Sequence, residues 1–268
     1  MLLDTTRAET DDDGGLMRLN RYCALCGLGS RRFCDTIIAS GKILLNGKRV
    51  FELGNKIDPR RDTVHYEGRT LRPLRPYTCL AYHKPRGVMV TKSDPEGRPT
   101  VYEALKRAGH EADDLRYIGR LDFNSEGLLL LTNDGALVHA LTHPRYHIKK
   151  VYEVCINKKL AAADAARMRD EGVASEGQLL RVGAVSAMNG TAEGRWYSID
   201  LYEGKKRQIR RIFEALGYAV VRLKRVQFAS VKTGDLRPGA ARTLTMREVA
   251  ALKAAGYGHS KGKRACGR

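Results

Sequence analysis

A run of four leucines, residues 128–131, is followed by the turn-forming residues Asn133-Asp134-Gly135. A strand with one face in water alternates apolar and polar residues, whereas this run is apolar throughout. The run therefore predicts a short strand that is covered on both faces. The chain is expected to fold around a sheet with this strand in its interior.

Asp122 lies shortly before this strand, in the segment Gly119-Arg120-Leu121-Asp122 followed by residues 123–127. A loop held by the core on one side can keep a reactive group rigid and open to a substrate. An Asp before a strand is also a common turn or cap residue. A catalytic role for Asp122 is thus a hypothesis that the rest of the chain must support.

The charge of the chain indicates a polyanionic partner. Its 268 residues include 48 Lys and Arg against 30 Asp and Glu, a formal net charge of +18. Such a field attracts nucleic acid and holds it by counterion release. A basic membrane anchor would gather its charge on one amphipathic helix, whereas here the charge is spread over several segments. Nucleic acid is therefore favoured over anionic lipid, and the length allows one large domain or two smaller ones.

Residues 1–16 are acidic at Asp11-Asp12-Asp13 and are expected to form a disordered extension, not a signal peptide. No stretch is long enough to span a membrane, so we expect a cytoplasmic protein. Six cysteines fit that compartment as free thiols. A zinc site is suggested by Cys23, Cys26 and Cys34, but a fourth ligand at suitable spacing is missing. The first two cysteines also fall in an apolar helical pattern, so buried thiols are favoured over zinc ligands.

Residues 17–76 read as a compact basic module. Apolar positions recur at helical spacing over residues 18–26, and Ser30 is placed to cap a second helix that is expected to bury Phe33, Ile37 and Ile38 and to end at residues 40–41. Asn46-Gly47 between short apolar and basic runs is the favoured type I′ hairpin signal. A DNA-reading helix-turn-helix is the alternative, but a basic hairpin does not usually follow it.

This module resembles the S4 domain, a small RNA-binding unit. The resemblance is carried by Arg18-Leu19-Asn20, by Ser30-Arg31-Arg32 and by Asn46-Gly47. It implies RNA contact through the second helix and the hairpin, largely by shape and backbone. The side chains assigned to phosphate contacts are Arg31, Arg32, Lys42, Lys48 and Arg49.

A proline-punctuated linker over residues 72–76 separates this module from a second domain, residues 77–255. There we expect strands at 78–82 and 88–91 around the turn Lys84-Pro85-Arg86-Gly87, and helices at 100–108 and 135–141. An alternating strand over 149–156 places Tyr152 on an apolar face, and a second such strand spans 195–202. Residues 256–268 are Gly-, Lys- and Arg-rich and are expected to form a flexible basic tail.

A helix with a strongly basic start is predicted after residue 204. Ile209, Ile212, Phe213 and Leu216 make one apolar stripe, and five cations crowd the first turns: Lys205, Lys206, Arg207, Arg210 and Arg211. Cations near a helix N-terminus are unfavourable, so a nearby phosphate or carboxylate would offset the cost. A merely solvated basic face is the alternative.

Four motifs are recognisable in order along the chain: Lys84-Pro85-x-Gly87, Gly119-Arg120-Leu121-Asp122, Lys150-x-Tyr152 and Gln208-Ile209-Arg210. With the S4-like module before these motifs, the chain resembles the RsuA family of ribosomal RNA pseudouridine synthases over nearly all of residues 17–252. The resemblance implies that Asp122 is the catalytic aspartate, Tyr152 the active-site tyrosine and Arg210 the basic residue paired with the aspartate. It also implies that Leu223 lines the uracil pocket. The side chains Lys84, Arg120, Lys150 and Arg207, within or beside these motifs, are assigned to the substrate.

The resemblance also implies an α+β fold: a mixed, largely antiparallel sheet in two halves, with helices outside and the active cleft between the halves. It implies a monomer, no metal and no cofactor. Uracil is detached from C1′ of the ribose, rotated and rejoined through C5, so the product is an isomer. A flipped-out uridine would stack on Tyr152, while Arg210 would keep the carboxylate ionised. Whether Asp122 attacks C1′ or takes the C2′ proton is left open.

Two other functions compete with this one. A glycoside hydrolase needs two carboxylates, and Glu126 is the near candidate for the second. A noncatalytic RNA-binding assembly factor would use the basic surfaces and leave the cleft idle; the intact set of Asp122, Tyr152 and Arg210 argues against it. The S4-like region and the basic tail look closer to family members that act on large-subunit than on small-subunit ribosomal RNA, so the former is the expected substrate.

Overall fold

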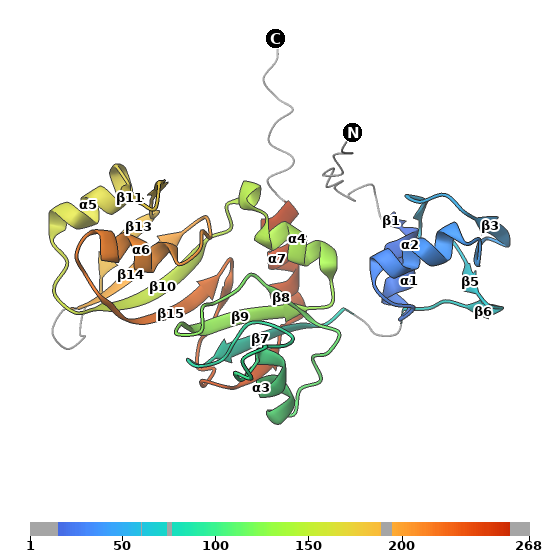
Figure 1. Ribbon diagram of the computed structural model, residues 1–268, viewed down its shortest axis with the longest axis horizontal. Coiled ribbons are helices and arrows are strands. Elements are labelled where there is room, and N and C mark those ends of the chain that lie inside the picture. Colours follow the sequence, from blue (N-terminus) through green and yellow to red (C-terminus); the bar gives the residue numbers. More distant parts are fainter. Residues whose placement is uncertain (1–15, 60, 74–76, 189–194, 258–268) are drawn as a thin grey trace, which may run out of the picture. The chain divides into compact units, whose positions relative to one another are not determined.

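The computed structural model describes residues 16–59, 61–73, 77–188 and 195–257. The chain divides into two compact units between Pro76 and Tyr77, here called the N-terminal unit and the C-terminal unit (Figure 1). The predicted acidic extension, apart from Leu16, and the predicted basic tail from residue 258 lie outside the described residues.

The N-terminal unit contains two short helices and small sheets. Strand β1 (Met17–Arg18) pairs antiparallel with β4 (Lys56–Ile57). Helices α1 (Leu19–Leu25) and α2 (Arg31–Ala39) follow β1. A four-stranded sheet has the order β3-β2-β5-β6 and is built from β2 (Ile43–Leu45), β3 (Lys48–Val50), β5 (Val64–Tyr66) and β6 (Arg69–Thr70).

The predicted helix cap at Ser30 and the predicted hairpin turn at Asn46-Gly47 are both present in this unit. The Ser30 hydroxyl accepts a hydrogen bond from the Phe33 N–H at 3.2 Å, which caps α2. Asn46 and Gly47 both have positive φ, 50° and 80°, as a type I′ hairpin requires. The prediction that Phe33 is buried is wrong, because its side chain is 53% exposed and the core of the unit takes Cys34, Ile37 and Ile38 from this helix instead.

The C-terminal unit is built on a nine-stranded sheet. Seven strands follow the order β13-β14-β10-β15-β9-β7-β17, while β16 pairs with β15 and β8 with β9. Their bounds are β7 (Cys79–Lys84), β8 (Arg116–Ile118), β9 (Glu126–Thr132), β10 (Lys150–Ile156), β13 (Ala184–Ala187), β14 (Trp196–Leu201), β15 (Val220–Phe228), β16 (Val231–Lys232) and β17 (Ala241–Thr243).

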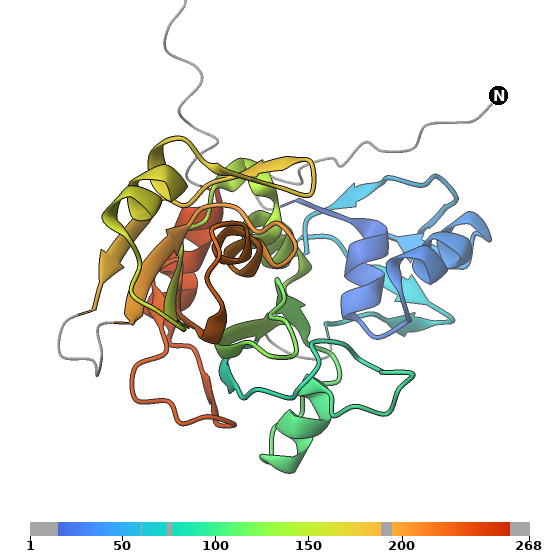
Figure 2. The same ribbon diagram turned by 60° about the vertical axis from the view of Figure 1, so that its left-hand side comes forward.

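Helices and a small hairpin surround this sheet. They are α3 (Val101–Arg107), α4 (Gly135–Thr142), the 3₁₀ turn η1 (Pro144–Tyr146), α5 (Ala162–Asp170), the hairpin β11 (Val173–Ser175) and β12 (Gln178–Leu180), α6 (Gln208–Ala215) and α7 (Met246–Tyr257). Figure 1 shows α4 and α7 together on one side of β7 and β9, with α3 on the other side, while α5 lies toward the β13 end of the sheet (Figures 1 and 2).

The leucine strand is covered on both faces, as predicted. Leu129 and Leu131 belong to a core cluster shared with α3 and α6, and Leu128 and Leu130 belong to a second cluster shared with α4 and α7. All four leucines have no exposed surface. The strand can be apolar throughout because each face contacts its own layer.

A short parallel contact joins two antiparallel halves of the sheet. Lys224 and Arg225 of β15 pair with Glu126 and Gly127 of β9, and the other strand pairs of this sheet are antiparallel. A Cβ at Gly127 would lie 2.2 Å from the Arg225 carbonyl oxygen, and the Gly127 φ is +106°. Only glycine allows this close approach. The expected mixed, largely antiparallel α+β architecture is therefore confirmed.

Three details differ from the sequence prediction. Residues 88–91 form no strand, because they lack a partner strand and contribute only an isolated bridge from Met89 to Thr100. Helix α6 begins at Gln208, so Lys205, Lys206 and Arg207 precede it. Helix α7 runs through residue 257, so the predicted flexible tail is wrong for residues 256 and 257.

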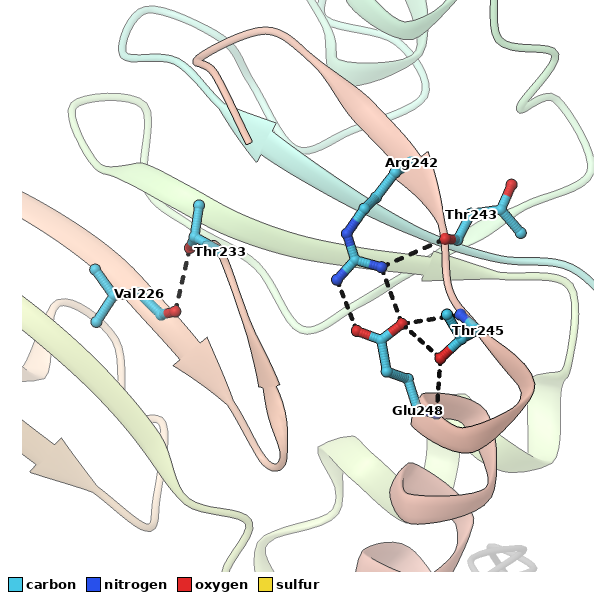
Figure 3. A network of polar contacts seen from close by, with 6 residues as sticks. All are labelled: Val226, Thr233, Arg242, Thr243, Thr245 and Glu248. Atoms are coloured by element: carbon cyan, nitrogen blue, oxygen red, sulfur yellow. Dashed lines mark hydrogen bonds and ion pairs between the residues drawn. The ribbon is translucent and has the colours of Figure 1, made fainter. Parts of the chain in front are cut away.

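Helix α7 begins with a network of polar contacts (Figure 3). The Glu248 carboxylate accepts two hydrogen bonds from the Arg242 guanidinium, at 2.6 and 2.9 Å. It also accepts one from the Thr245 N–H at 2.8 Å, and the Thr245 hydroxyl accepts from the Glu248 N–H at 3.2 Å. These reciprocal contacts satisfy the free N–H groups at the helix start and connect the helix to β17.

Candidate active site

Asp122 lies on the loop between β8 and β9. Its neighbour Leu121 is buried in the first core cluster, and the Ser125 N–H donates to the Asp122 carbonyl at 3.0 Å, which closes a turn. The Asp122 side chain is half-buried. Its carboxylate accepts no hydrogen bond from any residue that the structure describes. The loop therefore holds the Asp122 carboxylate in place without donating a hydrogen bond to it.

Lys84, at the end of β7, holds this loop from the interior. The side chain has no exposed surface, and its ammonium donates to the carbonyls of Pro85 and Val88 at 2.8 Å and of Phe123 at 3.4 Å. Burial lowers the pKa of Lys84 to about 8, against the opposing attraction of Asp122 and Glu126. These donors are directed at main-chain carbonyls, so the position of Lys84 does not support the expected substrate contact.

The turn after Lys84 supports the same loop. The Gly87 N–H donates to the Phe123 carbonyl at 2.9 Å, so this carbonyl receives donors from both ends of the Lys84-to-Gly87 motif. Phe123 directly follows Asp122. The motif thus acts on the position of the aspartate through the main chain.

Arg210 approaches the loop from α6. Its guanidinium donates to the Asn124 carbonyl at 3.0 Å and to the Val220 carbonyl at 3.3 Å. Burial lowers the pKa of Arg210, with Arg207 and Arg86 adding to the effect and Asp122 opposing it. Its Nε is buried and has no hydrogen-bond partner among the described residues.

Arg210 and Asp122, which were expected to pair, lie near each other but do not form an ion pair. Among the described residues the two side chains form no contact within 4.0 Å, because Arg210 bonds to the main chain two residues after the aspartate. The charge of Asp122 opposes the lowering of the Arg210 pKa that burial causes. Asp122 therefore has cations near it, Lys84 and Arg210, whose hydrogen bonds go elsewhere.

Glu126, the second carboxylate of the hydrolase hypothesis, is the first residue of β9 and not part of an irregular loop. Its side chain is 9% exposed, and its Oε1 accepts from Nη2 of Arg222 at 2.7 Å and from Nε at 3.1 Å. The Arg222 guanidinium lies 5.6 Å from the centroid of the Trp196 ring. A carboxylate neutralised in this way is poorly suited to act as a general acid. Sequence reasoning missed Arg222, whose only signal is its place beside Leu223.

Tyr152 and Leu223 lie on neighbouring strands. Leu223 of β15 pairs with Val154 of β10, two residues after Tyr152. Tyr152, Leu223 and Leu121 all belong to the first core cluster. The apolar face predicted for Tyr152, Val154 and Ile156 is confirmed, since all three are buried. The cluster connects the tyrosine and the leucine to the residue before Asp122.

A family model described as RNA pseudouridylate synthase matches residues 78–215. The chain belongs to the RNA pseudouridine synthase family. The matched segment includes Asp122, Tyr152 and Arg210, whereas Leu223 and the N-terminal unit lie outside it. The chain is accordingly an RNA pseudouridine synthase, in agreement with the expected enzyme class.

Similar proteins cover nearly the whole synthase. The ribosomal large subunit pseudouridine synthase B of Bacillus subtilis is 36% identical over 239 residues, 88% of this chain and 96% of the relative. An uncharacterized RNA pseudouridine synthase of Aquifex aeolicus is 33% identical over 250 residues, 92% of this chain and 98% of the relative. A crystal structure of a pseudouridylate synthase aligns with a TM-score of 0.60 at 26% identity, covering 88% of this chain and 99% of the other.

The remaining side chains assigned to the substrate lie in different settings. Arg120 and Arg207 are exposed, and Arg207 has the left-handed φ of 51° as the residue before α6. Lys150 is turned inward: its ammonium donates to the Ile148 carbonyl at 2.8 Å, and burial and Arg225 lower its pKa to about 8. The position of Lys150 does not support a substrate contact.

The basic residues before and within α6 make different contacts. Arg211 is buried and donates to the Ser175 carbonyl at 2.5 Å and to Gln178 at 3.2 Å, so it anchors the β11–β12 hairpin. Lys205 lies 3.3 Å from Glu203, and Arg211 lies 3.3 Å from Glu176. Carboxylates therefore supply part of the anionic compensation expected at this helix start.

The N-terminal unit of the synthase exposes every cation that was assigned to RNA: Arg31, Arg32, Lys42, Lys48 and Arg49. Cys23, Cys26 and Cys34 are buried in its core, where desolvation raises the pKa of Cys23 to about 12 and that of Cys26 to about 11. The interpretation of these residues as buried thiols is confirmed.

Within the described ranges, no group of three or more His, Cys, Asp and Glu side chains is arranged to hold a metal ion. None of the helices that the structure describes is both long enough and apolar enough to cross a membrane.

Proposed function

We propose that this synthase converts a specific uridine of large-subunit ribosomal RNA to pseudouridine, with Asp122 as the catalytic carboxylate. Two observations support the choice of RNA. The Bacillus subtilis relative is named for the large ribosomal subunit, and the net charge of +18 favours a polyanionic substrate. Ribosomal RNA also makes the cytoplasm the expected compartment, and the enzyme acts as a monomer.

The single observation that carries the role of Asp122 is its setting. The carboxylate is half-buried and accepts no hydrogen bond from the described residues, yet the loop around it is fixed by donors from Lys84, Gly87 and Arg210. A carboxylate that only capped a turn would bond to nearby N–H groups. A rigid but unoccupied carboxylate is instead suited to act on a substrate.

The proposed reaction uses the neighbouring side chains as follows. The target uridine leaves its RNA stack, which costs a few kcal/mol and is offset by contacts in the site. Tyr152 offers an aromatic face and Leu223 an apolar wall. Asp122 acts on the ribose, at C1′ or C2′, and the uracil is released from C1′, turns and bonds through C5. The C5 proton leaves and N1 gains one, so no ATP or redox cofactor is consumed.

Cations around the carboxylate fit a phosphodiester substrate. Arg86 and Arg207 are exposed and lie near enough to Arg210 to lower its pKa. An RNA phosphate would supply the anion that these cations lack. The N-terminal unit, which we take to be an S4 domain, would add further phosphate contacts through its exposed cations.

The proposal is tested by release of the C5 proton. Ribosomal RNA transcribed with uridine tritiated at C5 should lose tritium to water with the wild-type enzyme and not with Asp122→Asn, which keeps the shape of the side chain. Asp113→Asn, an exposed loop aspartate before β8, is the matched control and should release tritium normally. Tight RNA binding without tritium release by the wild type would favour the assembly-factor alternative.

A further inference from the structure

Two phenylalanine rings are exposed on the N-terminal unit. Phe33, in the first turn of α2, is 53% exposed, and Phe51, the residue after β3, is 57% exposed. Each ring lies against a glycine: a Cβ at Gly29 would lie 2.6 Å from the Phe33 ring, and one at Gly41 would lie 2.2 Å from the Phe51 ring. Each ring therefore rests on main chain at one side and stays largely open.

These rings are placed among cations. Over residues 31–53 the chain carries five cationic side chains against the two carboxylates Asp35 and Glu52, and all five cations are exposed. Leaving a Phe side chain in water forgoes the free energy that burial would give. An exposed apolar group in a basic setting matches a ligand that is anionic and also has flat apolar faces.

We propose that Phe33 and Phe51 are stacking platforms for unpaired RNA bases, with the neighbouring cations holding the phosphates. This inference rests on the proposed function, because it takes RNA as the substrate. Bases in a duplex are covered by their neighbours, so an aromatic ring can stack only on a base that is unpaired and splayed out. The N-terminal unit thus reads single-stranded RNA, beyond the shape and backbone contacts expected from its cations.

The two rings serve separate bases. Phe33 lies at the start of α2. Phe51 packs on Gly41, which comes two residues after the end of α2. The seven residues from Phe33 to the end of α2 span about 10 Å, which is more than one base covers. Each ring therefore contributes to affinity independently of the other.

The test is RNA binding by the full chain, measured with a single-stranded oligouridine that carries one 2-aminopurine and with a fully paired duplex of equal length. Phe33→Leu and Phe51→Leu keep apolar volume but remove the flat face. Each should weaken single-strand binding about tenfold and reduce the quenching of 2-aminopurine. Neither should change duplex binding or the salt slope, since no phosphate contact is lost.

Two controls make the result specific to stacking. Leu53→Ala removes an apolar side chain that is 61% exposed in the same unit, and it should leave the affinity unchanged. Phe33→Trp and Phe51→Trp should restore binding, because an indole also stacks.

Unchanged single-strand affinity in both leucine variants, with binding still weakened by Arg31→Ala, would overturn the stacking role and leave the proposed function standing. So would a fall in thermal stability without loss of RNA affinity, which would place the rings against protein. If the wild-type chain bound neither the oligouridine nor the duplex, and did not bind ribosomal RNA, the proposed function would be overturned as well.

Discussion

Lys84 shows how a buried cation can act through the main chain on Asp122, the proposed catalytic group. Its ammonium bonds to three carbonyls, one of them next to Asp122, and its pKa is lowered to about 8. The sequence suggested a substrate contact for this residue. Its true setting depends on Phe123, 39 residues away, which the fold brings to it.

Replacing Lys84 tests this positioning role. Lys84→Met should lower kcat by about 100-fold, because a loop displaced by about 1 Å misplaces the carboxylate. KM for RNA should change little, because the ammonium reaches no substrate. Steady-state assays on ribosomal RNA would separate the two constants. A rise in KM at constant kcat would contradict the role.

The pH dependence of stability gives a second readout for Lys84. Its folded pKa is about 8 and its ordinary value is 10.5, so the unfolded chain holds the proton more tightly between these values. Stability of the wild type relative to Lys84→Met should therefore rise as the pH increases from 8 to 10.5. Denaturant titrations of both proteins at several pH values would show this, and an equal pH dependence would speak against a buried charge.

The Glu126–Arg222 pair makes a separate prediction at this scale. Glu126 is 9% exposed and Arg222 is 49% exposed, so solvent screens the pair only in part. A double-mutant cycle of Glu126→Gln and Arg222→Met should give a coupling energy of about 1 kcal/mol in unfolding. Lys149 and Asp200, 2.6 Å apart with the lysine 42% exposed, form a comparison pair. A coupling near zero would remove Arg222 as the partner of Glu126.

At the scale of elements, the start of α7 depends on Glu248 (Figure 3). The Arg242 guanidinium and the Thr245 donors lower the pKa of Glu248 to about 2, from an ordinary 4.5. A lowered folded pKa contributes stability that is present above pH 4.5 and is lost as the pH falls toward 2. Because Arg242 is 38% exposed, the contribution is modest.

Glu248→Gln should therefore lose about 1 kcal/mol of unfolding free energy at neutral pH. The amide can still accept from the Thr245 N–H, but the charge pair with Arg242 is gone. The difference from the wild type should shrink as the pH falls below 4.5. Glu214→Gln, at an exposed position on α6, is the control. A difference that is constant with pH would contradict the ion-pair origin of the effect.

Elements with local signals could be predicted from the sequence. The leucine strand, the Ser30 cap and the Asn46-Gly47 turn each depend on residues adjacent in the chain, and the structure has all three. Residues 88–91 were misassigned because apolar composition alone does not supply a partner strand. The burial of Phe33 was misassigned because its helical position faces away from the core.

The candidate site was predictable only where motifs mark it. Asp122, Tyr152 and Arg210 were named from their motifs, and their catalytic roles are still predictions. The Arg222 contact to Glu126 spans 96 residues, and Arg210 reaches Asn124 across 86 residues. Such contacts follow from the pairing of β15 with β9 and the placement of α6, which no local pattern encodes.

At the scale of the whole molecule, binding and chemistry are expected to reside in different units. Arg31→Ala and Arg49→Ala should each weaken RNA binding and reduce the slope of log affinity against log salt by about one. The rate at saturating RNA should be unchanged. Arg69→Ala, an exposed arginine on β6 of the same unit, is the matched control. A lower saturated rate with normal affinity would contradict this division.

By the function proposed above, Asp122 makes this chain act on one uridine of large-subunit ribosomal RNA. A nucleotide-resolution pseudouridine map of both ribosomal RNAs tests this, with free RNA, subunits and precursor particles each incubated with the wild type and with Asp122→Asn. A pseudouridine is expected in large-subunit RNA with the wild type and should be absent with the variant. The same site with both proteins, or no site on any of these substrates, would contradict it.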